Sequence, residues 1–321
     1  MASEIDYYAG RMVLVTGAAG FIGSHMVDAL VRLGAKVRAL DDLSDGRLEN
    51  LAQSLDRLSF TRGSVCDPTV VEPLVDGCDV VFHLAANASV PRSAERPDLD
   101  FQANALGVFR VLDAVRRLGK PRLVFASSAA VYGEPLAGAM DEDHLLRPKS
   151  PYGGSKLAGE FMVLAHAHCY DLDARRVRIF NTYGPRQRRY VMFDLLEKLR
   201  RDPTHLEVLG TGAQERDYNY VSDTVAALLI LGADPGARGG VFNVAGGSPV
   251  NIRELVEVLI ETLGIPRPEI RYTGQSWPGD VQRMIGDIGR LRGLGHRHAC
   301  DLRSGLRELI AWHRQAFGPP W

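Results

Sequence analysis

Two residues spaced four apart, Tyr152 and Lys156, form the pattern in this sequence with the most chemical content. They occur in the stretch PYGGSK, which we expect to open a helix, and residues i and i+4 share one face of a helix. An ammonium beside a phenol favours the phenolate and lowers the pKa of the phenol. The pair suits a general base that removes a proton from a hydroxyl group. Such a pair is also common on a solvated helix face, so its meaning depends on what accompanies it.

A serine at the end of an apolar strand supports the catalytic interpretation. Ser128 follows the stretch over residues 123–126, which we interpret as a strand. Open α/β sheets place their sites at the carboxyl ends of the strands. We therefore expect Ser128 to hydrogen-bond a substrate hydroxyl and the oxygen of Tyr152. The next two residues, Ala129 and Ala130, supply no second acid or base.

A glycine-rich turn, GAAGFIG, follows the first apolar run of the chain. Gly17, Gly20 and Gly23 permit a tight turn, and the helix that they open offers N–H donors to a pyrophosphate. Asp41 and Asp42 end the second apolar run, roughly twenty residues further on. A carboxylate at that place accepts hydrogen bonds from a ribose diol and repels a 2′-phosphate. The pattern indicates NAD rather than NADP.

The elements that must hold these motifs follow from hydrophobic periodicity. We predict strands at residues 11–16, 36–40, 57–62, 79–84, 123–126 and 174–179. We predict helices at residues 21–33, 70–75, 101–118, 152–170, 251–263 and 302–317. Strands that alternate with helices imply an α/β fold with a doubly wound parallel sheet of the Rossmann type.

Beyond residue 181 the elements become shorter and richer in glycine and proline. This change predicts a smaller C-terminal lobe, interleaved with the first domain. We expect an NAD-binding domain over residues 1–180, with a return segment at about 217–246. Residues 181–216 and 247–321 would form the substrate-binding lobe.

Composition excludes several classes of function. The chain has 321 residues and a net charge of −1, so nothing attracts it to nucleic acid or to an acidic membrane. No stretch approaches the roughly 20 apolar residues of a membrane span, and the acidic start does not resemble a secretory signal. We expect a cytoplasmic protein. The four cysteines lack CxxC spacing, and we interpret them as reduced core thiols rather than metal ligands: Cys66, Cys78, Cys169 and Cys300.

The GxxGxxG spacing, the downstream YxxxK and the chain length together resemble the extended short-chain dehydrogenase/reductases. This branch comprises the nucleotide-sugar epimerases and dehydratases, and the resemblance runs from about Val13 to Leu291. It implies NAD as cofactor, a UDP-sugar as substrate and a homodimer paired through the helices at 101–118 and 152–170.

The resemblance also assigns residues to the cofactor. Ser64 departs from the family, which usually has Asp at this place against the adenine. The implied cofactor-binding residues are Gly17, Gly20, Phe21, Ile22, Gly23, Asp41, Asp42, Ser64, Val65, Leu84, Ala85, Ala86, Asn104, Tyr152, Lys156 and Phe180.

Further residues are implied for the substrate, and they include arginines suited to a diphosphate. Arg186, Arg188 and Arg189 form a basic cluster, and either of the last two would pair with a uronic acid carboxylate. The alternative is a loop that simply meets solvent. The implied substrate-binding residues are Ser128, Asn181, Arg188, Arg216, Asp280 and Arg283.

Ser128, Tyr152 and Lys156 form the implied catalytic trio. Related dehydratases carry acids just after the serine, and related decarboxylases carry a Glu before Val-Tyr-Gly, where this chain has Ala129 and Ala130. We therefore expect an NAD-dependent 4-epimerase of a UDP-hexose, either UDP-glucose and UDP-galactose or the corresponding uronates. The 4-hydroxyl would be oxidised to a ketone, the sugar would rotate, and the hydride would return to the opposite face.

Two alternatives stay open. The stretch RIFNTYGPR over residues 178–186 is similar to UDP-glucuronate decarboxylases, and a nucleotide-sugar reductase would use the same trio. A non-catalytic NAD-binding regulatory protein is the alternative from a different class.

Overall fold

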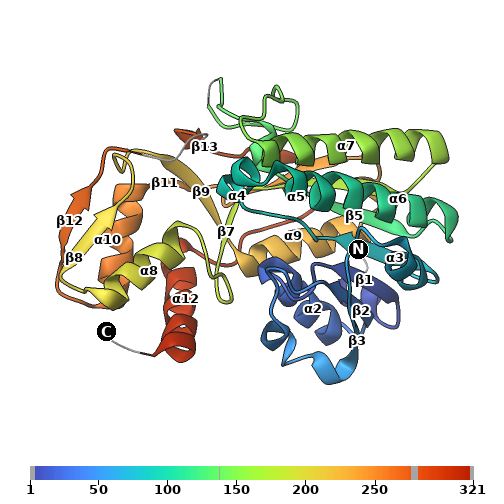
Figure 1. Cartoon of the computed structure of the whole chain (residues 1–321), viewed down its shortest axis with the longest axis horizontal. Helices are drawn as coiled ribbons and strands as arrows, with labels where there is room; N and C mark the ends of the chain where they lie inside the picture. Colours follow the sequence, from blue (N-terminus) through green and yellow to red (C-terminus); the bar gives the residue numbers. More distant parts are fainter. Residues whose placement is uncertain (1–3, 137, 276–280, 319–321) are drawn as a thin grey trace.

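The computed structural model describes residues 4–136, 138–275 and 281–318 (Figure 1). Its centre is a seven-stranded parallel sheet with the strand order β10-β6-β5-β4-β1-β2-β3. The strands are β1 (Met12–Thr16), β2 (Lys36–Asp41), β3 (Leu58–Arg62), β4 (Val80–His83), β5 (Arg122–Ser128), β6 (Ala174–Ile179) and β10 (Val241–Val244). This sheet confirms the predicted α/β fold, because order and direction are those of a doubly wound sheet.

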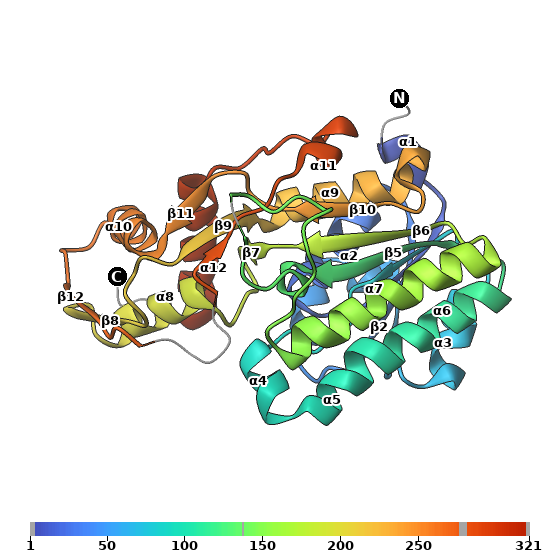
Figure 2. The same cartoon turned by 90° about the horizontal axis from the view of Figure 1, so that it is seen from above.

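Helices cover both faces of the sheet (Figure 2). One face carries α3 (Pro68–Val75), α6 (Gly107–Arg117) and α7 (Pro151–Tyr170). The other carries α2 (Phe21–Arg32) and α9 (Val221–Ala233), with α1 (Glu4–Tyr8) against α9. Short 3₁₀ turns lie at Leu48–Leu51, Leu55–Arg57, Ala129–Val131 and Pro235–Ala237.

Alternation along the strands divides the core into two layers. In β1, Val13 and Val15 join the core that contains Met26 of α2, whereas Leu14 joins the core that contains Val108 of α6. Successive side chains of a strand point to opposite faces, so a strand buried on both faces must be apolar throughout. This is why β1 reads as a continuous apolar run.

The helix predicted at residues 101–118 is interrupted in the structure. It begins as α5 (Pro97–Phe101), continues as a π-helical segment over Gln102–Leu106 and ends as α6. A short preceding helix, α4 (Val90–Glu95), packs against α7. π-helical turns within α-helices occur frequently at functional sites, and this one carries Asn104.

The C-terminal part of the chain forms a second group of elements beside the carboxyl edge of the sheet. A core around Leu196, Leu255 and Leu309 holds its helices together. Asn251 caps α10 through a capping box with Glu254, as expected from the sequence. The elements are β7 (Asn181–Tyr183), α8 (Val191–Arg201), β8 (His205–Val208), β9 (Glu215–Tyr220), β11 (Pro249–Asn251), α10 (Ile252–Leu263), β12 (Glu269–Tyr272), β13 (Arg283–Met284) and α12 (Leu302–Phe317). The short helix α11 (Gly289–Gly293) instead packs against β10 of the central sheet.

Between the elements of this group, the chain returns to the central sheet. α9 packs against α2, and β10 pairs with β6 at the edge of the sheet. Neither element was among the predicted helices and strands, because α9 is apolar on every side and β10 is short. The domain boundaries given above stay a prediction.

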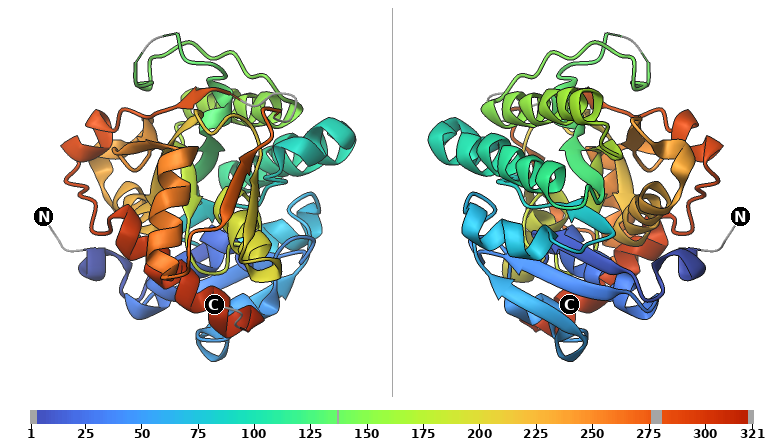
Figure 3. Two further views of the ribbon diagram at one scale, coloured as in Figure 1. Left: turned by 90° about the vertical axis from the view of Figure 1, so that its left-hand side faces the viewer. Right: turned by 90° about the vertical axis from the view of Figure 1, so that its right-hand side faces the viewer.

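Several further features bear on the function classes. Seen end-on, the loop between β5 and α7 projects beyond the layer of α7 (Figure 3). Among the described residues, none of the helices is long and apolar enough to cross a membrane. The same part of the chain contains no group of three His, Cys, Asp or Glu side chains that could hold a metal ion. Cys169 is exposed, so the prediction of a core thiol was wrong there.

Candidate active site

The helix that carries Tyr152 and Lys156, α7, begins at residues that favour a helix start. The side chain of Ser150 accepts a hydrogen bond from the N–H of Gly153 at 3.1 Å, and Pro151 occupies the first helical position. A Cβ at Gly153 would lie 2.5 Å from the carbonyl oxygen of Ala130, so only glycine allows this close approach. The start of α7 is thereby fixed against the segment that follows Ser128.

The structure brings the three predicted catalytic residues together at this point. The side chains of Ser128, Tyr152 and Lys156 are buried, with 8%, 9% and 2% exposure. Tyr152 and Ser128 share a side-chain hydrogen bond. The ammonium of Lys156 donates to the carbonyl oxygen of Ala126 in β5 at 2.9 Å. The trio therefore spans the carboxyl end of β5 and the facing side of α7.

Burial dominates the acidity of these groups. It raises the pKa of Tyr152, while the hydrogen bond from Ser128 and the positive charge of Arg189 oppose this effect. It lowers the pKa of Lys156 to about 8, against the opposing carboxylates of Asp100 and Glu160. In the protein alone, the net effect on the pKa of Tyr152 is upward, and the lowering by Lys156 stays a prediction.

A buried polar network lies directly beneath the trio. Ser127 donates to Glu160 at 2.6 Å, and Glu160 pairs with Arg178 at 2.8 Å. Arg178 donates to the hydroxyl of Tyr132 at 2.9 Å, and Tyr132 donates to Asn243 at 2.7 Å. Because Ser127 precedes Ser128 and Glu160 lies one turn beyond Lys156, the network fixes β5 relative to α7.

The glycine loop between β1 and α2 has the geometry of a phosphate cradle. Gly17 has a φ of +69°, and a Cβ there would lie 2.7 Å from the amide nitrogen of Ala85. Gly20 caps α2 without a side chain, so the first turn, which contains Phe21, Ile22 and Gly23, is open to a ligand. Amide donors and the helix dipole suit a pyrophosphate at this place.

The two acidic residues after β2 differ in their surroundings. The buried carboxylate of Asp41 accepts from the N–H groups of Ala19 at 2.9 Å and Leu43 at 2.8 Å. Burial raises its pKa. Asp42 is exposed and accepts from the N–H of Ser44 at 2.9 Å. Asp41 therefore holds the glycine loop, and a ribose contact of either residue stays a prediction.

The other predicted cofactor residues line the same edge of the sheet. Leu84, Ala85 and Ala86 follow β4 and are half-buried, and the N–H of Ala85 donates to Thr16 at 3.2 Å. Phe180 is 4% exposed and follows β6.

The adenine-side residues lie after β3. Val65 is buried against the position of Gly107, where a Cβ would lie 2.8 Å from the valine methyl. The hydroxyl of Ser64 accepts from the N–H of Cys66 at 3.2 Å, so it is engaged within its own turn.

Asn104 connects α7 to the segment after β4. Its amide oxygen accepts from the N–H of Asn87 at 2.9 Å. Its amide nitrogen donates to the carbonyl oxygen of Asn87 at 3.0 Å and to Ser155 at 3.1 Å. Ser155 in turn donates to Asp100 at 2.6 Å. Asn104 therefore positions its neighbours, and a direct contact with the cofactor stays a prediction.

Three predicted substrate residues lie on neighbouring short strands. Asn181 of β7 pairs with Tyr218 of β9, and Arg216 of β9 lies opposite Met284 of β13, next to Arg283. The amide nitrogen of Asn181 is buried and has no hydrogen-bond partner among the described residues, as expected of a group that awaits a ligand. Asp280 lies outside the described residues.

The structure does not bring Arg188 to the trio. Its guanidinium donates to Glu49 at 2.8 Å and lies over the rings of Phe317 and Trp312, 4.9 and 5.8 Å from their centroids. This arginine already has a carboxylate and two aromatic partners, so its predicted contact with the substrate gains no support.

The three arginines of the basic cluster instead pair with acidic residues in and after α2. Arg189 pairs with Asp45 at 3.2 Å, and Arg186 pairs with Asp28 of α2 at 2.7 Å. The positive charge of Arg189 also lowers the pKa of Tyr152, against the larger effect of burial.

Two buried residues near the site were not predicted. His83 ends β4, is 1% exposed and shares a 2.8 Å hydrogen bond with Thr16. Asn87 is 9% exposed and directly follows the predicted run Leu84–Ala86. That adjacency was the one signal in the sequence for Asn87.

Comparisons with known proteins decide the family. The model of the NAD dependent epimerase/dehydratase family matches residues 13–245. The chain belongs to this family. A UDP-glucose 4-epimerase of Mycolicibacterium smegmatis is 37% identical over 94% of this chain and 98% of its own. A dTDP-glucose 4,6-dehydratase of an Actinoplanes species is 36% identical over 94% of this chain and 97% of its own.

A solved structure agrees with these relatives. The dTDP-glucose 4,6-dehydratase DesIV of Streptomyces venezuelae, crystallised with NAD, superposes with a TM-score of 0.90 at 30% identity. The superposition covers 96% of this chain and 98% of that one. The predicted resemblance and the NAD cofactor are confirmed. The chain is an enzyme of the epimerase/dehydratase family that acts on nucleotide sugars, so the regulatory alternative is set aside.

Proposed function

We propose that the protein is an NAD-dependent 4-epimerase of a UDP-hexose, with UDP-glucose and UDP-galactose as the pair interconverted. The observation that carries this proposal is the composition of the catalytic edge. Ser128, Tyr152 and Lys156 meet there, and the two residues after Ser128 are Ala129 and Ala130. Such a site has one proton-transfer group, which is what a reversible oxidation at one carbon needs.

The residues divide the work as follows. Ser128 and Tyr152 hydrogen-bond the sugar 4-hydroxyl, and the phenol oxygen of Tyr152 takes its proton and later returns it. Lys156, fixed by Ala126, supplies positive charge beside the phenol. A bound NAD would supply reversible hydride transfer at C4 of the sugar. Between the two transfers the sugar turns within the site.

Relatives with the name dehydratase make elimination of water the main competitor. Elimination needs an acid at the leaving hydroxyl, and Ala129 and Ala130 provide none. The buried acids near the trio are already engaged: Glu160 pairs with Arg178, and Glu142 accepts from the N–H of Asn243 at 2.7 Å. This composition favours epimerisation.

The likeness of residues 178–186 to decarboxylases also has a structural explanation. Arg178 begins that stretch and lies in the buried network with Glu160 and Tyr132. Its contacts position β6 relative to α7 and involve no group of the catalytic trio. The stretch therefore does not favour decarboxylation over epimerisation.

The test is to incubate the purified protein with UDP-glucose, UDP-N-acetylglucosamine, UDP-glucuronate and dTDP-glucose and to follow the products by NMR. We expect UDP-galactose from UDP-glucose at equilibrium, without net NADH. A 4-keto-6-deoxy sugar, or a pentose with release of carbon dioxide, would contradict the proposal.

A further inference from the structure

Asn87 has a buried amide that the protein itself does not satisfy. The residue is 9% exposed, and neither its side-chain oxygen nor its side-chain nitrogen has a hydrogen-bond partner among the described residues. A buried amide without partners is destabilising, and such groups are rare in folded proteins. The amide therefore calls for a partner from outside the chain.

Asn104 fixes the position of the Asn87 backbone. The side chain of Asn104 hydrogen-bonds both the N–H and the carbonyl of Asn87, at 2.9 and 3.0 Å. The same side chain donates to Ser155 of α7, the residue before Lys156. The backbone of Asn87 is thereby tied to the catalytic helix, while its own side chain takes no part in the link.

The residues that follow Asn87 lie close to Tyr152. The hydroxyl of Tyr190 donates to the carbonyl of Ala88, and Tyr190 is close enough to Tyr152 to affect its pKa. Ser93 of the following helix accepts from the N–H of Tyr152 at 3.1 Å. Asn104 and Ser93 thus both hydrogen-bond residues of α7, so the segment that carries Asn87 lies against the start of that helix.

We infer that Asn87 is a substrate-specificity residue that hydrogen-bonds a sugar hydroxyl next to the reacting carbon. An amide offers two N–H donors and one carbonyl acceptor and carries no charge. A hydroxyl also donates and accepts, so one sugar hydroxyl satisfies both orphaned atoms. A phosphate would satisfy only the nitrogen. This inference rests on the proposed function, since it takes the ligand to be a UDP-hexose.

The role predicts discrimination against sugars that lack that hydroxyl. A site built to hydrogen-bond a hydroxyl rejects a deoxy analogue, because its polar groups are left buried and unpaired. Calorimetric titrations in a Tyr152→Phe background, where turnover is suppressed, would compare UDP-glucose with its 2-deoxy, 3-deoxy and 6-deoxy analogues. We expect one analogue to bind about tenfold more weakly than UDP-glucose, and Asn87→Ala to abolish that difference.

Two readouts separate this role from a structural one. The amide makes no bond within the described chain, so Asn87→Ala should keep the thermal midpoint and the affinity for UDP alone. The control is Asn219→Ala, because the buried amide of Asn219 donates to Thr224 at 2.9 Å. That variant should lose stability and keep the discrimination.

The outcomes are distinct. Unchanged discrimination in Asn87→Ala overturns the inference, and so does a loss of bound NAD, which would assign the amide to the carboxamide of nicotinamide. A wild-type protein that binds UDP-glucose with discrimination but does not form UDP-galactose overturns the proposed function and leaves the contact of Asn87 standing.

Discussion

At the scale of single residues, the surroundings of the proposed base Tyr152 disfavour its ionised form. Its side chain is 9% exposed, and burial raises its pKa. Ser128 and Arg189 lower the pKa, and Lys156 adds charge nearby only while it is itself protonated. The protein thus holds the phenol in place, and we expect the positive charge of the bound nicotinamide to favour its ionised form.

Replacing this hydroxyl tests its role. Tyr152→Phe should reduce kcat by about 10²–10⁴-fold, the usual contribution of a general base. NAD content and the thermal midpoint should change little, because the ring stays in place. Tyr170→Phe, at the far end of the same helix, is the matched control and should keep kcat. Equal activities in the two variants would remove Tyr152 from the mechanism.

His83 gives a second residue-scale prediction, on the acid stability of the fold. Burial, with a smaller effect from Lys156, lowers its pKa to about 3 from the ordinary 6.5. The unfolded chain therefore binds a proton below pH 6.5 that the folded chain does not. The free energy of unfolding should fall by about 1.4 kcal/mol per pH unit as the pH drops from 6.5 toward 4.

Denaturant titrations of wild type and His83→Gln across that pH range measure this effect. The variant lacks the titrating group and should show a shallower decline than wild type. Parallel declines would show that His83 keeps an ordinary pKa.

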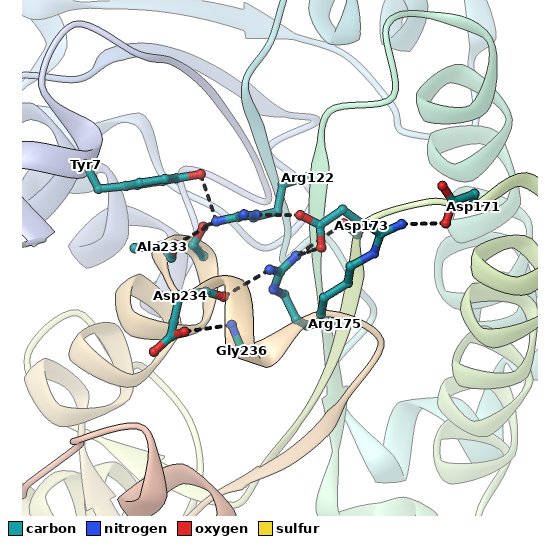
Figure 4. Close-up of polar contacts among 10 residues, drawn as sticks. Tyr7, Arg122, Asp171, Asp173, Arg175, Ala233, Asp234 and Gly236 are labelled. Atoms are coloured by element: carbon teal, nitrogen blue, oxygen red, sulfur yellow. Dashed lines mark hydrogen bonds and ion pairs between the residues drawn. The ribbon is translucent and has the colours of Figure 1, made fainter. Parts of the chain in front are cut away.

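At the scale of elements, one polar cluster joins four of them at the amino edge of the sheet (Figure 4). Asp173 pairs with Arg122 of β5 at 2.8 Å and with the fully buried Arg175 of β6. Arg122 also donates to the hydroxyl of Tyr7 and to the carbonyls of Gly232 and Ala233 at the end of α9. The cluster anchors the returning helix α9 to β5, β6 and α1, far from the catalytic edge.

Loss of the carboxylate of Asp173 should therefore lower the free energy of unfolding and leave kcat unchanged. Asp173→Asn leaves a buried guanidinium without its charge partner and should cost about 3 kcal/mol of unfolding free energy. The matched control is Asp171→Asn. Asp171 pairs with Arg238 at the surface, and Asn tolerates its φ of +54°.

That control should shift the free energy by less than about 0.5 kcal/mol. Urea unfolding of both variants decides the question, and equal losses would contradict the assigned role of the cluster.

The features that could be predicted from the sequence are local, and those that could not depend on residues far apart in the chain. The strand over residues 174–179 was predicted to the residue, and Tyr152 and Lys156 lie within one helix turn, so local pattern suffices for them. The pairing of Arg188 with Glu49 could not be predicted, because Glu49 lies far away in the sequence, and the contact of Arg188 with the substrate stays a prediction. The need of Asn87 for a partner is visible only once the fold shows what surrounds it.

At the scale of the whole molecule, the outer helices carry exposed aromatic side chains. Within the helix predicted at residues 101–118, Val108, Val111 and Leu112 are buried in the chain's own core. Phe101 and Phe161 on the same layer are 62% and 54% exposed. We propose that this layer pairs two copies of the chain, since large apolar groups at a surface favour association.

Light scattering tests the pairing. The wild type should have about twice the chain mass of 35.2 kDa, and the double variant Phe101→Lys with Phe161→Lys should have the mass of one chain. The control is Leu136→Lys, which changes an equally exposed apolar residue on the loop between β5 and α7 and should stay dimeric. A monomeric wild type would refute the dimer.

The central claim is that hydride leaves C4 of the sugar and returns to C4. UDP-glucose that carries deuterium at C4 tests it directly, with the products analysed by NMR. We expect UDP-galactose with the deuterium still at C4. In a 4,6-dehydration the hydride from C4 is delivered to C6 after water has left. Deuterium at C6, or its loss to solvent, would contradict the account.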